Sequence, residues 1–256
     1  MNPVAFEIFG LEIRWYGIII AMGVLAAMIL INILAKKKGL DYDVIIDVFL
    51  IVFPVAIIGA RLYYVAFEYK NYHTLMDVIN IRKGGMAIHG GVIAALITGY
   101  FYAKHKKINF LKYADVIIPG VILAQAIGRW GNFMNQEAHG GEVTEKFIRY
   151  FPEFIQKGML INGTYYHPTF LYESIWNLLV CGILIYILLK CKKANSGVVL
   201  GAYMILYSLG RFFIEGLRTD SLMFLGLRTA QIVSLLGIVF GMVLIVHVNK
   251  NKSKKE

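Results

Sequence analysis

The chain has few charged residues and few cysteines for its 256 residues. Asp, Glu, Lys and Arg make up 16% of the sequence, whereas soluble domains usually contain about 25%. Hydrophobic residues make up 58%, and the mean hydropathy is +0.63. These values exclude an ordinary soluble domain and predict an integral membrane protein.

Several common signals of function are also missing. The sequence contains no H-E-x-x-H, G-x-S-x-G or phosphate-binding-loop motif, and its carboxylates lack the spacing of a two-metal site. We therefore expect no bound metal and no cofactor. Cys181 lies in an apolar run and Cys191 in a lysine cluster, so we expect free thiols and no disulfide framework.

We expect a single membrane domain without a dividing linker. There is no linker rich in Ser, Pro or Gly and no visible internal repeat, so residues 1–256 are predicted to form a single membrane domain. Residues 1–11 contain no basic residue and are followed by no small-residue cleavage site, so we expect no removable signal peptide. The net charge of +10 suggests nucleic acid as a partner, but the basic residues are scattered over short loops between apolar runs, which argues against it.

Long apolar runs dominate what is present. A helix needs about 20 residues to cross the hydrocarbon of a bilayer. Seven predicted transmembrane helices, all α in class, can be drawn over residues 16–35, 44–67, 86–103, 114–127, 170–189, 198–214 and 229–248. The fourth is short unless it continues past residue 130, and its end is left open.

Lysines predict the orientation of these helices. Four lysine clusters, at residues 36–38, 104–112, 190–193 and 250–255, follow the first, third, fifth and seventh helices. They therefore lie on one side, which the positive-inside rule makes cytoplasmic. The sequence predicts an N-terminus outside and a cytoplasmic C-terminus.

All eight arginines lie outside the lysine clusters. A planar guanidinium binds phosphate oxygens in pairs, which a lysine ammonium cannot do. Arg82 and Arg149 are interpreted as residues that extend to the outer interface. Arg61, Arg129 and Arg211 fall within or at the end of predicted helices, in the outer half of the membrane.

The most polar stretch at a helix end is G-R-W-G-N-F-M-N-Q-E (128–137). It places Arg129, Asn132, Asn135 and Glu137 next to hydrocarbon, where unused polar groups are costly. We expect these residues to form a pocket for an anionic lipid headgroup on the extracytoplasmic side.

Other polar groups are expected at the same level. His89, in an H-G-G motif, and Tyr16 begin the third and first predicted helices on the outer side. Tyr207, Arg211 and Glu215 are four residues apart and share one helix face. A packed core histidine and a purely structural Arg211–Glu215 ion pair are the alternatives.

Two predicted extracytoplasmic segments are longer than simple turns. Residues 136–169 are interpreted as a small head over the pocket, with a passive surface loop as the alternative, and residues 68–85 as a shorter arm. Loops of this length usually carry function or a small structure of their own.

At this point the sequence resembles the bacterial phosphatidylglycerol–prolipoprotein diacylglyceryl transferases. The motifs occur in the same order across nearly the whole chain, although Ala94 stands where that family often has glycine. They are residues 128–133 with Asn135 and Glu137, residues 14–17, residues 89–91, residues 167–168 with 171–173, Tyr207 with Arg211 and Glu215, and Gln231 with Ser234.

The resemblance implies that the diacylglyceryl group of phosphatidylglycerol moves to the lipobox cysteine of a prolipoprotein, forming a thioether and releasing glycerol phosphate. The implied partners are phosphatidylglycerol, prolipoprotein signal peptides and membrane lipids. His89, Arg129 and Arg211 are then catalytic, His89 as the base and the arginines on the phosphate. Asn132, Asn135, Glu137, Tyr16, Tyr207 and Glu215 are assigned to substrate binding.

Two other classes fit part of this pattern. A transporter or channel for an anionic lipid or solute would also use arginines in the membrane, although such proteins usually contain repeats and bind at the midplane. A lipid transferase that uses metal-bound phosphates is the other, and the missing carboxylate motif argues against it.

Overall fold

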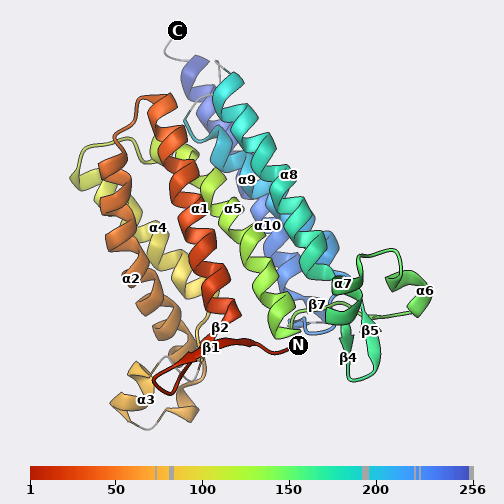
Figure 1. Ribbon diagram of the computed structural model, residues 1–256. Coiled ribbons are helices and arrows are strands. Elements are labelled where there is room, and N and C mark those ends of the chain that lie inside the picture. Colours follow the sequence, from red (N-terminus) through yellow and green to blue (C-terminus); the bar gives the residue numbers. More distant parts are fainter. Residues whose placement is uncertain (73, 81–83, 192–195, 222, 225, 254–256) are drawn as a thin grey trace. The chain divides into compact units, whose positions relative to one another are not determined.

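The computed structural model is mainly helical and describes residues 1–256 except 73, 81–83, 192–195, 222, 225 and 254–256 (Figure 1). Arg82 and four of the clustered lysines, Lys192, Lys193, Lys254 and Lys255, lie outside the described residues. The chain divides into two compact units. The first contains Met1–Lys38 and Ala114–Glu256, and the second contains Gly39–Tyr113.

Among the described residues, six helices are long and apolar enough to cross a membrane. The helix at the third predicted span, α4 (Ile88–His105), is not one of them, because two histidines, Lys104 and three glycines lower its hydropathy. The six are α1 (Trp15–Lys38), α2 (Tyr42–Phe67), α5 (Phe110–Asn135), α8 (Thr169–Lys190), α9 (Val198–Glu215) and α10 (Thr229–Ser253). An integral membrane protein built mainly from helices is thus confirmed.

In the first unit, α8 packs between α5 and α9. The Ser174 hydroxyl donates to the Ala126 carbonyl over 2.9 Å, and the Cys181 thiol donates to the Pro119 carbonyl over 3.3 Å. The two contacts run in opposite chain directions, so α5 and α8 are antiparallel. Both cysteines are free, as predicted.

The contact of α8 with α9 depends on a glycine. A Cβ atom on Gly210 would lie 2.1 Å from the indole nitrogen of Trp176, which donates to the Leu206 carbonyl over 2.9 Å. The bare backbone at Gly210 lets the two helices approach closely, as small residues do in membrane helix pairs. This close approach brings Arg211, the next residue on α9, near α8.

A carboxylate at the lysine-rich end fixes the start of α9. Asp115, 5% exposed on α5, accepts from the backbone amides of Gly197 over 2.7 Å and of Leu200 over 2.8 Å. The first amides of a helix have no partner within the helix, and a carboxylate there satisfies them and favours the helix dipole. The N-terminus of α9 is therefore attached to α5.

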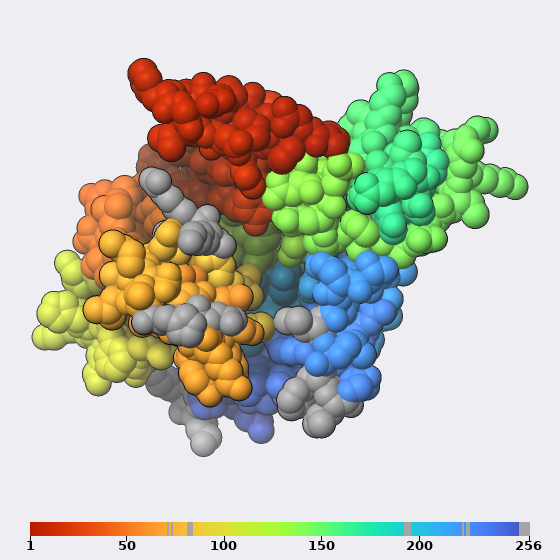
Figure 2. Space-filling model, turned by 90° about the horizontal axis from the view of Figure 1, so that it is seen from below, coloured from red at the N-terminus to blue at the C-terminus, as the bar shows by residue number. Residues whose placement is uncertain are grey.

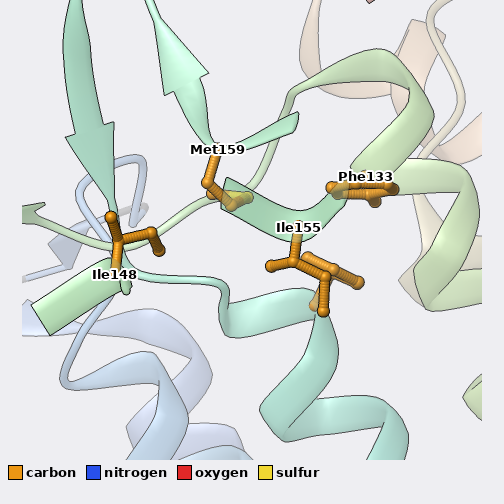
Figure 3. Packing of buried hydrophobic residues seen from close by; sticks show 5 residues of the cluster. Phe133, Ile148, Ile155 and Met159 are labelled. Atoms are coloured by element: carbon orange, nitrogen blue, oxygen red, sulfur yellow. The ribbon is translucent and has the colours of Figure 1, made fainter. Parts of the chain in front are cut away.

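The segment predicted as a head, residues 136–169, has its own structure. Ile148, Ile155 and Met159 form a buried cluster with Phe133 of α5 and Phe170 of α8, as seen in Figure 3. The head is thereby attached to the ends of two long helices. Its elements are β3 (Glu142–Val143), α6 (Glu145–Ile148), α7 (Glu153–Gly158), β4 (Leu160–Ile161) and β5 (Thr164–Tyr166), with the antiparallel sheet order β3-β5-β4.

Two β-hairpins complete the first unit. One consists of β1 (Val4–Ile8) and β2 (Leu11–Arg14) and leads into α1, and the other of β6 (Met223–Phe224) and β7 (Leu227–Arg228) and leads into α10. Figure 2 shows the N-terminal hairpin, the head and the segment before α10 on one face of this unit. These short strands are the part of the fold that the predicted all-helical class did not include.

The second unit is a helix pair with an arm. A Cβ on Gly90 of α4 would lie 2.4 Å from the Gly59 carbonyl of α2, so the glycines that follow His89 serve a close helix contact. Ala94 contacts the same turn of α2, because a Cβ on Gly59 would meet its methyl group at 2.4 Å. The arm, residues 68–85, contains the short helices η1 (Tyr69–Asn71) and α3 (Leu75–Ile79).

Candidate functional site

The polar stretch 128–137 forms the last turns of α5, which continues to Asn135. Trp130 and Phe133 face the head, where their rings meet edge to face at 6.1 Å. Arg129 and Asn132 are three residues apart, and the Arg129 Nη1 to Asn132 Oδ1 distance is 3.4 Å. The amphipathic end of α5 thus holds the head with one side and presents polar groups on another.

Glu173 of α8 joins the two predicted catalytic arginines of the first unit. Its Oε2 lies 2.8 Å from Arg129 Nε, and its Oε1 lies 3.0 Å from Arg211 Nη1. Arg211 Nη2 lies 2.6 Å from Glu215 Oε2, one turn further along α9. Two guanidinium groups from different helices therefore meet on one carboxylate.

Two further arginines extend this cluster. Arg218 lies 3.7 Å from Glu173 and binds Asp220 with both Nε and Nη2, at 2.9 and 2.8 Å. Arg228 donates through Nη1 to the Glu215 carbonyl. We define the arginine cluster as Arg129, Arg211, Arg218, Arg228, Glu173, Glu215 and Asp220.

Glu173 and Glu215 of the cluster are buried, whereas Asp220 is exposed and Arg129 and Arg211 are partly exposed. The side chains of Glu173 and Glu215 are 5% and 3% exposed, whereas those of Arg129 and Arg211 are 22% and 19% exposed. Ion pairs away from water are strong, and each buried carboxylate here has more than one cationic or donor neighbour. No described residue accepts a hydrogen bond from Arg129 Nη2, so that edge can receive a ligand.

The titration of Asp220 shows the influence of Arg218 outside the helices. Partial burial by itself would raise the pKa of Asp220, but the hydrogen bonds and the charge of Arg218 outweigh it and hold that pKa below its ordinary value. The pKa of Arg218 is in turn raised, because Asp220, Glu173 and Glu215 together outweigh desolvation. The edge of the cluster therefore stays ionised at neutral pH.

The structure brings three other predicted residues together at the end of α5. Glu137 accepts from Asn132 Nδ2 over 2.9 Å and from Asn135 Nδ2 over 3.3 Å. Glu137, assigned to substrate binding from the sequence, therefore holds the side-chain amides of Asn132 and Asn135. The ring of Tyr16 of α1 packs against Gly131 of α5, because a Cβ atom on Gly131 would lie 2.8 Å from that ring.

Tyr207 lies one turn before Arg211 on α9, and its ring stacks on that of Tyr203 at 5.4 Å. Tyr203 exchanges hydrogen bonds with Gln125 of α5, one turn before Arg129. Polar side chains therefore continue from the arginine cluster along the same two helices.

His89 and Arg61 belong to the second unit. The exposed ring of His89, in the first turn of α4, lies 6.3 Å from the ring of Tyr63. Arg61, 6% exposed, donates to five backbone carbonyls of the arm at 2.7 to 3.1 Å. Those carbonyls belong to Asp77, Val78, Asn80, Gly84 and Gly85.

The sequence reasoning left Glu173 and Arg218 out of the site. Both stood in motifs that supported the family resemblance or followed Arg211, but the pairing of Glu173 with two other helices requires the packing of α5, α8 and α9. Within the described part of the chain, no group of three or more His, Cys, Asp or Glu side chains is placed to hold a metal ion.

Comparison with known proteins gives a consistent result. The family model described as prolipoprotein diacylglyceryl transferase matches residues 3–247. The chain is 63% identical over 257 residues to phosphatidylglycerol–prolipoprotein diacylglyceryl transferase 1 of Clostridium perfringens, covering 100% of this chain and 98% of that protein. It is 57% identical to the Clostridium kluyveri transferase (100% and 99% covered) and 55% identical to that of Clostridium botulinum strain Loch Maree (99% and 100% covered).

Proposed function

Because the chain belongs to the prolipoprotein diacylglyceryl transferase family, we propose that its arginine cluster binds the phosphate of phosphatidylglycerol while the lipid's diacylglyceryl group is transferred to a prolipoprotein. The chain is a transferase of lipoprotein maturation, as its relatives are named. The observation that carries the assignment of the site is the shared contact of Arg129 and Arg211 with Glu173.

The transfer replaces one bond of the lipid. The lipobox cysteine loses its thiol proton, and its sulfur attacks the glycerol carbon that carries the phosphate. A carbon–sulfur bond forms, the carbon–oxygen bond to the phosphate breaks, and glycerol phosphate leaves with the electron pair. Negative charge grows on the leaving phosphate, so fixed cations near it lower the barrier.

The charges of the cluster suit a phosphodiester. Arg129, Arg211, Arg218 and Arg228 stand against Glu173, Glu215 and Asp220, which leaves one net positive charge. A phosphodiester carries one negative charge, so its binding neutralises the site. Arg129 and Arg211 hold the phosphate with their partly exposed edges, and Glu173 and Glu215 keep both guanidinium groups oriented.

The remaining predicted residues of the first unit bind the rest of the lipid headgroup in the proposal, and His89 is assigned a role in the chemistry. Asn132 and Asn135, oriented by Glu137, donate to the glycerol headgroup, and Tyr16 and Tyr207 hydrogen-bond the lipid at the edge of the cluster. His89 accepts the thiol proton, because a thiol becomes a strong nucleophile only as the thiolate. The exposed His89 ring in the second unit is available for this task.

The proposal includes a topology. The chain forms one membrane domain of seven transmembrane helices, namely the six apolar helices and α4. The lysine clusters lie on the cytoplasmic side. The N-terminus and the head then lie outside, and the C-terminus lies inside the bacterial cell. Prolipoprotein signal peptides and membrane lipids are the partners, and nucleic acid is not.

A transfer assay tests this assignment. Purified protein is mixed with phosphatidylglycerol and a lipobox peptide, and the peptide is examined by mass spectrometry for a diacylglyceryl group on its cysteine. We expect the mass increase together with one glycerol phosphate released per peptide. Unmodified peptide, or lipid movement without a covalent product, contradicts the proposal.

A further inference from the structure

A second set of polar side chains lies one to two helical turns below the arginine cluster. Gln125 comes four residues before Arg129 on α5, and Asn177 comes four residues after Glu173 on α8. Tyr203 comes eight residues before Arg211 on α9, with Tyr207 between them. We call Gln125, Asn177 and Tyr203 the polar layer.

Two contacts place Asn177 on the side of α8 that faces α5. Ser174, three residues before it, donates to the Ala126 carbonyl, and Cys181, four residues after it, donates to the Pro119 carbonyl. Residues three and four apart share one helix face. Asn177 therefore lies between these two contacts. Gln125, the residue before Ala126 on α5, donates through Nε2 to the Tyr203 hydroxyl over 3.2 Å.

Asn177 has an unused hydrogen-bond donor in this position. The residue is 2% exposed, and its Nδ2 donates to no described residue. Within a bilayer, water cannot compensate such a group, so buried amides normally find an acceptor. Gln125 and Tyr203 are each partly exposed, so the layer is open to a ligand on one side.

The depth of the layer matches the chemistry of a diacyl lipid. One helical turn of four residues rises about 6 Å. In a glycerophospholipid the phosphorus and the nearest ester carbonyl carbon are separated by five single bonds, which also spans about 6 Å at ordinary bond lengths. With the phosphate on the arginines, the ester carbonyls reach the donors of Gln125 and Asn177. Tyr203, two turns before Arg211, belongs to the layer through its hydrogen bond with Gln125.

We propose that Gln125, Asn177 and Tyr203 recognise the ester carbonyl groups of the diacylglyceryl donor. This inference rests on the proposed function. The ester bonds are not broken in the transfer, so a lipid with ether-linked chains has the same reactive carbon and leaving group. The polar layer makes the enzyme distinguish the two lipids, since an ether oxygen is a weaker acceptor at a different position.

The test compares diacyl and dialkyl phosphatidylglycerol of equal chain length, each with the same lipobox peptide. We expect wild type to prefer the diacyl lipid about tenfold in kcat/KM, as one to two net hydrogen bonds would give. Gln125→Leu and Asn177→Leu should reduce this preference to about twofold. Tyr203→Phe, which removes only a hydroxyl, should lower the preference for the diacyl lipid less. This variant keeps the test valid if a leucine variant does not fold.

Cys181→Ala is the matched control, because it removes a buried polar contact four residues from Asn177 on the same face of α8. It should keep the full diacyl preference. Equal use of both lipids by wild type, or an unchanged preference in all three variants, overturns the proposal. A change only in KM for the peptide also overturns it, since the layer would then bind peptide carbonyls. If wild type transfers neither lipid, the proposed function itself fails.

Discussion

Both units contain arginine side chains within their helical part, and the two units use them differently. Arg61 in the second unit is 6% exposed and spends its donors on five neutral carbonyls of the arm. Arg129 and Arg211 in the first unit are partly exposed, and both pair with the carboxylate of Glu173, while Arg211 also pairs with Glu215. A guanidinium whose donors are all occupied by carbonyls supports structure, whereas one with a free edge can bind a substrate anion.

The difference follows from what surrounds each side chain. The carbonyls around Arg61 include the last ones of α3, which have no partner within that helix and attract a cation. Arg129 and Arg211 lie where three helices converge, and each of those helices contributes a charged residue. The comparison predicts that substitutions in the first unit change turnover and that substitution of Arg61 changes stability.

The largest expected effect comes from Arg129→Lys. The ammonium keeps the charge but lacks the planar fork that pairs two donors with a phosphate while another donor holds Glu173. We expect kcat/KM to fall by about 100-fold or more in the transfer assay, as for loss of a group that stabilises a transition state. Arg149→Lys, an exposed arginine of the head, is the control. Near-normal turnover of Arg129→Lys would remove the proposed distinction between the two kinds of arginine.

His89→Gln asks whether the second unit also takes part in the chemistry. We expect turnover near pH 7 to fall about 100-fold, as for loss of a general base. The deficit should shrink towards about pH 9, because a free thiol then ionises without help. The measurement is the ratio of variant to wild-type kcat across pH. A variant with most of its activity at neutral pH would leave the second unit with a supporting role only.

Arg61→Leu should act on stability. Loss of five hydrogen bonds from a charged donor should lower the free energy of unfolding by about 3 kcal/mol or more. Thermal unfolding in detergent measures this loss, and limited proteolysis should show earlier cleavage within residues 68–85. Arg149→Leu should change stability by less than about 0.5 kcal/mol, as most surface substitutions do. A stable Arg61→Leu protein that has lost its turnover would reverse our interpretation.

The smallest effect concerns Asp220. Its pKa in the folded protein is lower than in the unfolded chain, so its pairing with Arg218 stabilises the fold above the unfolded value of about 3.9. That contribution is lost as pH falls through the lower, folded value. We expect the melting temperature of wild type to drop more steeply below about pH 4 than that of Asp220→Asn. Parallel curves would show that the pair contributes nothing to stability.

Helix positions could be read from the sequence, because runs of apolar residues with lysines after them define spans and their ends. The open question at residue 130 had a local cause. Residues 128–137 are polar enough to suggest a loop. Trp130 and Phe133, however, lie on one face of a helix and pack against the head, so α5 continues to Asn135.

Pairings between helices could not be read in the same way. The spacing of Arg211 and Glu215 predicted their ion pair, since both lie on one helix. Glu173 was missed because its two arginines come from other helices, and their relative rotation depends on contacts such as Trp176 against Gly210. Arg61 was placed at the same depth as Arg129 and Arg211, and depth alone does not distinguish an arginine held by backbone carbonyls from one in a ligand site.

The attachment of α9 to Asp115 has a consequence for which amino-acid substitutions this enzyme tolerates. Leu200, whose amide that carboxylate holds, lies 11 residues before Arg211, or about 16 Å along the axis. Because a helix is stiff along its axis, a shift of its N-terminal end also displaces its C-terminal end. Substitutions at Asp115 would therefore misalign the guanidinium against the lipid from a distance, and a screen for loss of lipidation should recover them beside those at the reacting centre.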